Sequence, residues 1–122
     1  MPIISFANPK GGAGKTTSAL LLAGELARKG ARVVIVDADP ERWISQWARL
    51  PGKPDSIEIR GDVTEDTIVD QIEKAAEAAQ FVIVDLEGTA SLMVANAIGM
   101  SDFVVIPAQG ASMDAKGAAK TI

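Results

Sequence analysis

A glycine-rich stretch near the N-terminus carries the residue types with the clearest chemical purpose. It reads Lys-Gly-Gly-Ala-Gly-Lys-Thr-Thr over residues 10–17, between an apolar run and a segment rich in Ala and Leu. Glycines let a backbone pass close to a ligand with its N–H groups turned inward, and a following helix adds the positive end of its dipole. Strand, glycine-rich loop and helix in this order are typical of a phosphate-binding site.

Two side chains of this loop are placed to act on a chain of phosphates. Lys15 would reach the β and γ phosphates, and the Thr16 hydroxyl would hold Mg²⁺. The plain phosphate-loop pattern has Gly five residues before Gly14, where this chain has Pro9. A glycine-rich turn that holds two lysines by chance is the alternative. The residues predicted to bind the phosphates are Lys10, Gly11, Gly12, Ala13, Gly14, Lys15, Thr16 and Thr17.

Three carboxylates follow apolar runs that read as buried strands. Asp37 and Asp85 end two such runs, and Asp39 follows the first of them, just before Pro40. Ligands of an open parallel sheet bind outside the carboxyl ends of the strands, so we expect these carboxylates beside the phosphate loop. Mg²⁺ takes oxygen ligands, and Thr16, Asp37 and Asp85 are the predicted metal site. The alternative for each Asp is a helix cap or an ordinary loop carboxylate.

The hydrophobic pattern predicts an α/β fold, a doubly wound parallel sheet with helices on both faces. Asp39, Thr64 and Thr89 are the predicted N-caps of successive helices. We expect Trp43 and Trp47 to pack their short helix down; a partner-binding patch is the alternative. Expected strands span 3–7, 32–37, 56–60 at an edge, 81–85, and 103–106 as a buried strand; expected helices span 18–29, 41–50, 64–79, 90–98 and from 112 onward.

The amino-acid composition limits which classes of function are possible for the protein. The 122 residues are 48% hydrophobic and 23% charged, which predicts a single folded domain over 1–122. Cysteine and histidine are both absent, which excludes a thiol nucleophile, His-based acid–base catalysis and Cys- or His-ligated metals. The net charge of −4 does not suggest a nucleic-acid or membrane surface. No targeting segment or membrane-length apolar run is present, so we expect a cytoplasmic protein.

Several motifs together resemble one family. Lys-Gly-Gly-Ala-Gly-Lys-Thr, with its second lysine Lys10, is the deviant Walker A signature, and Phe-Val-Ile-Val before Asp85 has the Walker B form. Val-Asp-Ala-Asp-Pro at 36–40 and the stretches 96–109 and 114–117 are also similar. On these residues the chain resembles the ParA/MinD family of ATPases, and it is most similar to the plasmid and chromosome partitioning ATPases of bacteria.

The resemblance implies an ATP-binding and ATP-hydrolysing dimerisation switch in partitioning. In such a protein Lys10 crosses the dimer interface to the partner's nucleotide, Asp37 supports the Mg²⁺ shell and Asp39 orients the attacking water, so Lys10, Lys15 and Asp39 form the implied catalytic set. Implied partners are a second copy, a centromere-binding protein of the ParB type, and non-specific DNA in the nucleoid. The DNA-binding patch and adenine-binding segment lie largely beyond these residues, so we expect an N-terminal portion or a naturally truncated member.

Other functions within the same family differ in what they require. A MinD-like spatial regulator at a membrane would need a C-terminal amphipathic helix, and none is visible in the sequence. Iron–sulfur relatives hold their clusters through cysteine, which this chain lacks. A truncated module that binds nucleotide and dimerises without turnover is a further alternative.

Overall fold

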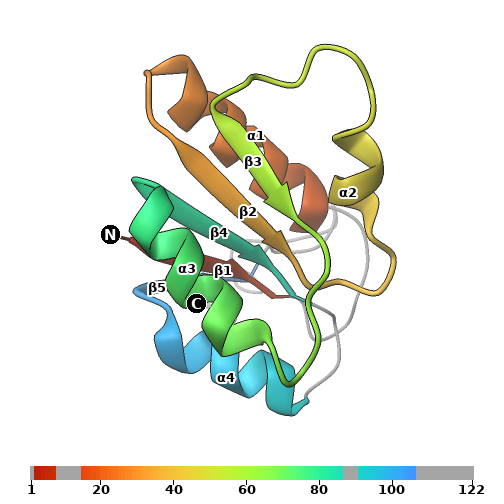
Figure 1. The fold of residues 1–122 in the computed structure, drawn as a ribbon, viewed down its shortest axis with the longest axis vertical. Helices are drawn as coiled ribbons and strands as arrows, with labels where there is room; N and C mark the ends of the chain where they lie inside the picture. The colour runs from red at the N-terminus through yellow and green to blue at the C-terminus, as the bar shows by residue number, and fades with distance from the viewer. Residues whose placement is uncertain (1, 8–14, 87–90, 107–122) are drawn as a thin grey trace, which may run out of the picture.

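The computed structural model describes residues 2–7, 15–86 and 91–106, and these form a parallel β-sheet with helices on both faces (Figure 1). The predicted fold class is therefore confirmed. The strands are β1 (Ile3–Phe6), β2 (Val33–Asp37), β3 (Ile57–Arg60), β4 (Phe81–Asp85) and β5 (Phe103–Val105). The helices are α1 (Lys15–Arg28), α2 (Trp43–Trp47), α3 (Ile68–Ala78) and α4 (Leu92–Met100).

The order of the strands places a ligand-binding position at the centre of the sheet. The order is β3-β2-β4-β1-β5, and every neighbouring pair is parallel. From β1 the chain crosses through α1 to β2 on one side, whereas from β4 it crosses through α4 to β5 on the other. Since β1 and β4 are neighbours, their carboxyl ends form a topological switch point, where open α/β sheets bind ligands.

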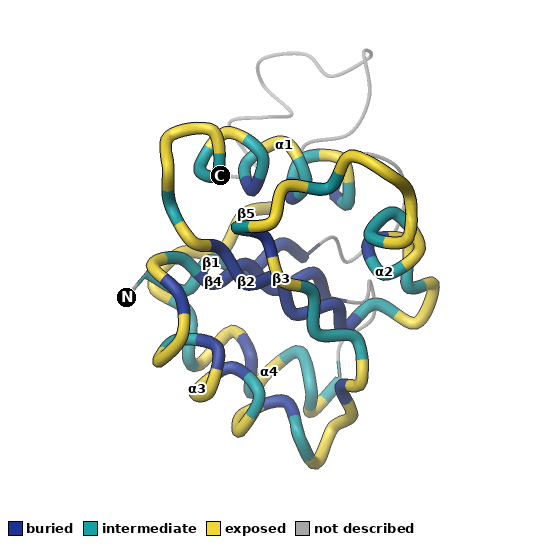
Figure 2. The backbone as a smooth tube through the Cα atoms, turned by 45° about the horizontal axis from the view of Figure 1, so that its top comes forward, coloured by how far each residue is buried: buried dark blue, intermediate teal, exposed yellow. Residues whose placement is uncertain are grey.

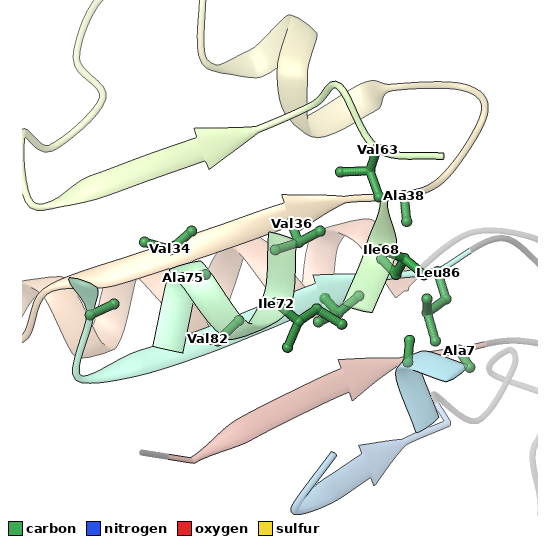
Figure 3. Packing of buried hydrophobic residues seen from close by; sticks show 13 residues of the cluster. Ala7, Val34, Val36, Ala38, Val63, Ile68, Ile72, Ala75, Val82 and Leu86 are labelled. Carbon is green, nitrogen blue, oxygen red and sulfur yellow. The ribbon is translucent and has the colours of Figure 1, made fainter. Parts of the chain in front are cut away.

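Alternating strand residues fill the two layers of the core. Val33 and Ile35 face α1 and α2, while Val34 and Val36 face α3 and α4. The two layers enclose the sheet from both sides (Figure 2). Burial on both faces explains why the strands read as continuous apolar runs. The predicted inner stripe of α3 is confirmed, and Figure 3 shows part of it against the sheet; its residues are Ile68, Ile72, Ala75 and Ala79.

The predicted helix starts are imprecise: α1 begins at Lys15 and not at 18, and the predicted starts of α3 and α4 are also wrong. Helix α3 begins at Ile68, four residues later than predicted, and Thr64 is not its cap. Instead Thr67 Oγ1 accepts a hydrogen bond from the Thr64 N–H at 2.9 Å, which forms a local turn ahead of the helix. Helix α4 is capped by Ser91, whose hydroxyl accepts from the Val94 N–H at 3.2 Å. The predicted cap Thr89 lies outside the described residues.

Helix α2 is shorter than predicted and begins without the expected cap. Its N-cap residue is Arg42, which has a left-handed backbone with φ of 55°. Asp39 Oδ1 accepts from the Glu41 N–H at 2.9 Å, a turn that precedes the helix. Trp47 packs against the core as expected, but Trp43 is 54% exposed, so the predicted packing is right for only one of the two.

The edges of the sheet differ from one another. The prediction of β3 as an edge strand is confirmed. Strand β5, predicted as buried, lies at the opposite edge, and Phe103 is 62% exposed. The error arises because an apolar run signals burial without showing which neighbours provide it. The helix predicted from 112 lies outside the described residues.

Within the described ranges no helix is long and apolar enough to span a membrane.

The packing of α3 predicts a contrast between its two faces. Ile72 is fully buried, so Ile72→Ala should lower the free energy of unfolding by about 2–5 kcal/mol through lost burial and a cavity. Val69 on the same helix is 38% exposed, and Val69→Ala should cost only about 0.5 kcal/mol. Urea denaturation of both variants tests this. Equal losses would contradict the assignment of the buried face.

Candidate functional site

The carboxyl ends of β2 and β4 bring two predicted site residues together. Asp37 and Asp85 are direct partners in the parallel register, and both are fully buried. Because side chains alternate along a strand, they lie on the same face as Ile35 and Ile83, which is the face that α1 covers. The first residue of α1 is Lys15. These strand ends therefore lie beside the start of α1; the glycine-rich loop itself lies outside the described residues.

Lys15 is buried in a cluster of opposite charge. Its Nζ donates to Asp85 Oδ1 at 2.5 Å and to Asp39 Oδ2 at 2.8 Å. Only 4% of Lys15 is exposed, and among the described residues Asp85 and Asp39 are its ion-pair partners. Thr16 Oγ1 donates to the other oxygen of Asp85 at 3.2 Å. The structure thus brings together four of the predicted site residues.

Burial dominates the electrostatics of Asp85. Desolvation raises the pKa of this carboxyl, and the nearby Asp37 and Asp39 charges act in the same direction. The hydrogen bond and charge of Lys15 lower the pKa and oppose burial only in part. An isolated carboxylate at this depth would be strongly disfavoured, so Lys15 is what permits Asp85 to carry its charge.

Asp37 makes different contacts from the other two carboxylates. Its Oδ2 accepts two hydrogen bonds from Ser45, at 2.9 Å from the backbone nitrogen and 2.7 Å from the hydroxyl. Its Oδ1 is buried and has no hydrogen-bond partner among the described residues. An unpaired buried carboxylate oxygen is costly, and a cation or one of its water ligands would satisfy it.

The donor set fits Mg²⁺. The Thr16 hydroxyl and the carboxylates of Asp37 and Asp85 offer only oxygen, which is the chemistry Mg²⁺ prefers. No three acidic side chains in the described part of the chain converge as a self-sufficient metal site. Mg²⁺ is characteristically bound through one or two carboxylates, with waters and substrate phosphates completing its shell, so this arrangement suits it.

Two residues that the sequence did not single out support Asp37. Besides Ser45, the Arg42 guanidinium donates to the main-chain oxygen of Asp37 and to that of Val63, the latter at 3.2 Å. These bonds tie the end of β2 to the segment after β3. No sequence pattern marks them, because both depend on how α2 folds back over the sheet.

Of the other residues predicted to bind nucleotide, the structure describes only Thr17. Thr17 lies in the first turn of α1 and is exposed. The other predicted residues, Lys10, Gly11, Gly12, Ala13 and Gly14, lie outside the described residues.

The raised pKa of Asp85 predicts a pH dependence of stability. The folded protein holds this proton more tightly than the unfolded chain, so the associated stability is present below the ordinary Asp pKa of about 4 and is lost as the pH rises through the folded pKa. Asp85→Asn removes that titration. Urea denaturation is measured at a series of pH values from below 4 upward. The free energy of unfolding of Asp85→Asn should rise relative to that of the wild type as the pH rises. A flat difference would contradict the assignment.

Comparison with known proteins places the chain in a family. The VirC1 protein family model matches residues 1–122. Protein ParA of Rhizobium radiobacter is 43% identical over 122 residues, which are 100% of this chain and 55% of that protein. The chain thus spans about half the length of the curated relatives it matches.

Solved structures share the fold at low sequence identity. A plasmid partition protein from Borrelia burgdorferi has a TM-score of 0.73 at 17% identity, covering 98% of this chain and 71% of that one. Cobyrinic acid a,c-diamide synthase from Mycobacterium smegmatis, with bound ATP analog and magnesium, has a TM-score of 0.75 at 18% identity, covering 99% and 63%. The chain therefore belongs to the VirC1 protein family, and its resemblance to ParA-type ATPases is confirmed.

Proposed function

We propose that this protein is an ATP-binding and ATP-hydrolysing dimerisation switch of the ParA type, acting in plasmid or chromosome partitioning. The observation that carries the proposal is the meeting of Lys15, Thr16 and Asp85 at the switch point of the sheet, directly after the glycine-rich loop. The 43% identity to a ParA protein and the fold shared with a plasmid partition protein support the biological setting.

The ion pairs of Lys15 suggest how the phosphates would be received. In the structure its ammonium is neutralised by Asp85 and Asp39. On binding, the ammonium would exchange carboxylate oxygens for phosphate oxygens, at little electrostatic cost because both acceptors are anionic. Thr16, Asp37 and Asp85 are the residues that would hold Mg²⁺, which when bound neutralises charge on the phosphates. The synthase with bound ATP analog and magnesium supports this pairing of fold and ligands.

Turnover would use Asp39 and Lys10. Asp39 is partly exposed beside Lys15, and once released from that lysine it could orient the attacking water. A free Asp is a weak base at neutral pH, so orientation is its proposed role. Lys10 would reach the partner's nucleotide in a dimer. ATP would then favour the dimer and hydrolysis would release it, a switch driven by differential affinity.

The proposal also includes binding partners and a cellular location. A second copy would join in the ATP-bound state. A centromere-binding protein of the ParB type would act on the switch, and non-specific DNA would be bound outside the residues of this chain. The setting would be the cytoplasm at the nucleoid.

The phosphate-loop role of Lys15 predicts a loss of nucleotide affinity on truncation. Lys15→Ala should weaken binding of a fluorescent ATP analogue with Mg²⁺ by roughly 10–150-fold, since a charged hydrogen bond is worth about 1.5–3 kcal/mol. Lys29→Ala, an exposed lysine just after the same helix, is the matched control and should bind like the wild type. Unchanged affinity in Lys15→Ala would refute the phosphate-loop assignment.

Lys10 and Asp39 should fail in opposite ways. Lys10→Ala should leave ATP binding by the monomer nearly intact while abolishing ATP-dependent dimers and hydrolysis. Asp39→Ala should bind ATP and dimerise without hydrolysing it, so dimers should accumulate. Light scattering with ATP, beside a phosphate-release assay, separates the two.

Each variant has its own contradicting result. A Lys10→Ala protein that still dimerises with ATP overturns the role of Lys10. If Asp39 only forms the turn before α2, its loss should cost about 1 kcal/mol of stability and leave turnover intact. Hydrolysis by Asp39→Ala at the wild-type rate would therefore favour that structural role.

A further inference from the structure

We propose that Ser45 is a positioning residue for the magnesium site, and that Gly61 provides the space in which it acts. Ser45 fixes the Asp37 carboxylate through one oxygen, so that the other oxygen remains free for Mg²⁺ or a water of its shell. The inference rests on the proposed function, because it assigns how one metal-binding side chain of that site is held.

The first observation is that Ser45 uses both of its donors on one atom. Its backbone N–H and its hydroxyl both donate to Asp37 Oδ2, at 2.9 and 2.7 Å. Two donors on one oxygen oppose rotation of the carboxylate. The other oxygen, Oδ1, is buried without a partner among the described residues. The carboxylate is therefore held in one orientation, with its free oxygen presented to something other than Ser45.

The second observation is where Asp37 lies. It is opposite Asp85 on the neighbouring strand, and both side chains are on the α1 face of the sheet. Thr16, at the start of α1, donates to Asp85 on that face. Asp37 thus lies on the sheet face that also carries the Asp85 carboxylate and the Thr16 hydroxyl, and these three side chains would hold Mg²⁺ through oxygen alone.

The third observation is the close approach of Gly61 to the hydroxyl of Ser45. Gly61 directly follows β3, and a Cβ placed on it would lie 2.7 Å from Ser45 Oγ but 3.7 Å from Ser45 Cβ. The first distance is too short for any real contact, whereas the second is an ordinary one. A side chain at position 61 would therefore displace the hydroxyl of Ser45 and spare the rest of the residue. The glycine is needed for space.

Helix stability alone is the competing explanation of the Asp37–Ser45 contact. Helix α2 has no side-chain N-cap bond from Arg42, so Asp37 could serve simply as an acceptor for an unpaired N–H of that short helix. The two explanations predict different losses. A helix-capping role affects unfolding, whereas a positioning role affects the affinity for Mg²⁺ separately from the affinity for nucleotide.

The test measures the Mg²⁺ requirement of nucleotide binding. Mg²⁺ is titrated into the metal-free protein with a non-hydrolysable fluorescent ATP analogue, for wild type, Ser45→Ala, Gly61→Ala and the double variant. Gly99→Ala is the matched control, because a Cβ there meets nothing within 4 Å. Nucleotide affinity in EDTA and thermal unfolding are recorded for each variant.

We expect Ser45→Ala to raise the half-saturating Mg²⁺ concentration by about 10–100-fold, as is typical for a residue that orients a metal ligand. Nucleotide affinity in EDTA should stay unchanged. Gly61→Ala should show a similar rise, and the double variant should match Ser45→Ala, because without the hydroxyl the added methyl has no clash to make. The Gly99→Ala control should match the wild type.

Several results would overturn the inference. One is an unchanged Mg²⁺ requirement in Ser45→Ala, including the case in which only its unfolding temperature falls. Another is a double variant whose loss is the full sum of the single losses. If the wild type itself binds the analogue without any response to Mg²⁺, the proposed function fails and this inference fails with it. A wild type that responds while Ser45→Ala does not differ from it refutes the inference alone.

Discussion

The ion pair between Lys15 and Asp85 constrains how the strands and helices around it are arranged. Both side chains are buried, and their charged atoms lie 2.5 Å apart although the residues are 70 positions apart in the chain. A buried charge without a partner destabilises a protein strongly, so the start of α1 and the end of β4 must meet. The placement of β4 beside β1 achieves this, because α1 starts just beyond β1.

The same interaction links the fold to ligand binding. Lys15 is held by two carboxylates in a position where a phosphate chain could take over as its counter-ion. A nucleotide that displaced the lysine would leave Asp85 without its main stabilising charge, and a divalent cation arriving with the phosphates would replace it. Binding of the proposed Mg²⁺ and ATP is therefore interdependent, since each compensates a charge that the other leaves unpaired.

The sequence allowed much of this arrangement to be predicted, because it depends on local periodicity. Continuous apolar runs ending in Asp37 and Asp85 indicated buried parallel strands with carboxylates at their carboxyl ends. Strands β2 and β4 have that form. Capping was harder to predict, since Thr64 and Thr67 are both cap-type residues and the Thr64 N–H donates to Thr67 Oγ1 in a turn before α3. Burial of β5 was predicted wrongly, since an apolar run cannot show that its strand lies at an edge. The contacts around Ser45 depend on how α2 folds back onto the end of β2 and the segment after β3, which no spacing in the sequence reveals.

If the proposed function is right, Lys15 exchanges carboxylate oxygens for phosphate oxygens when nucleotide binds. A crystal structure of the protein with Mg²⁺ and a non-hydrolysable ATP analogue would show this exchange. In that complex Lys15 Nζ should lie within hydrogen-bond distance of phosphate oxygens and no longer contact Asp39, with Mg²⁺ beside Thr16 and Asp85. A complex in which Lys15 keeps both of its carboxylate partners, with the nucleotide bound elsewhere, would contradict it.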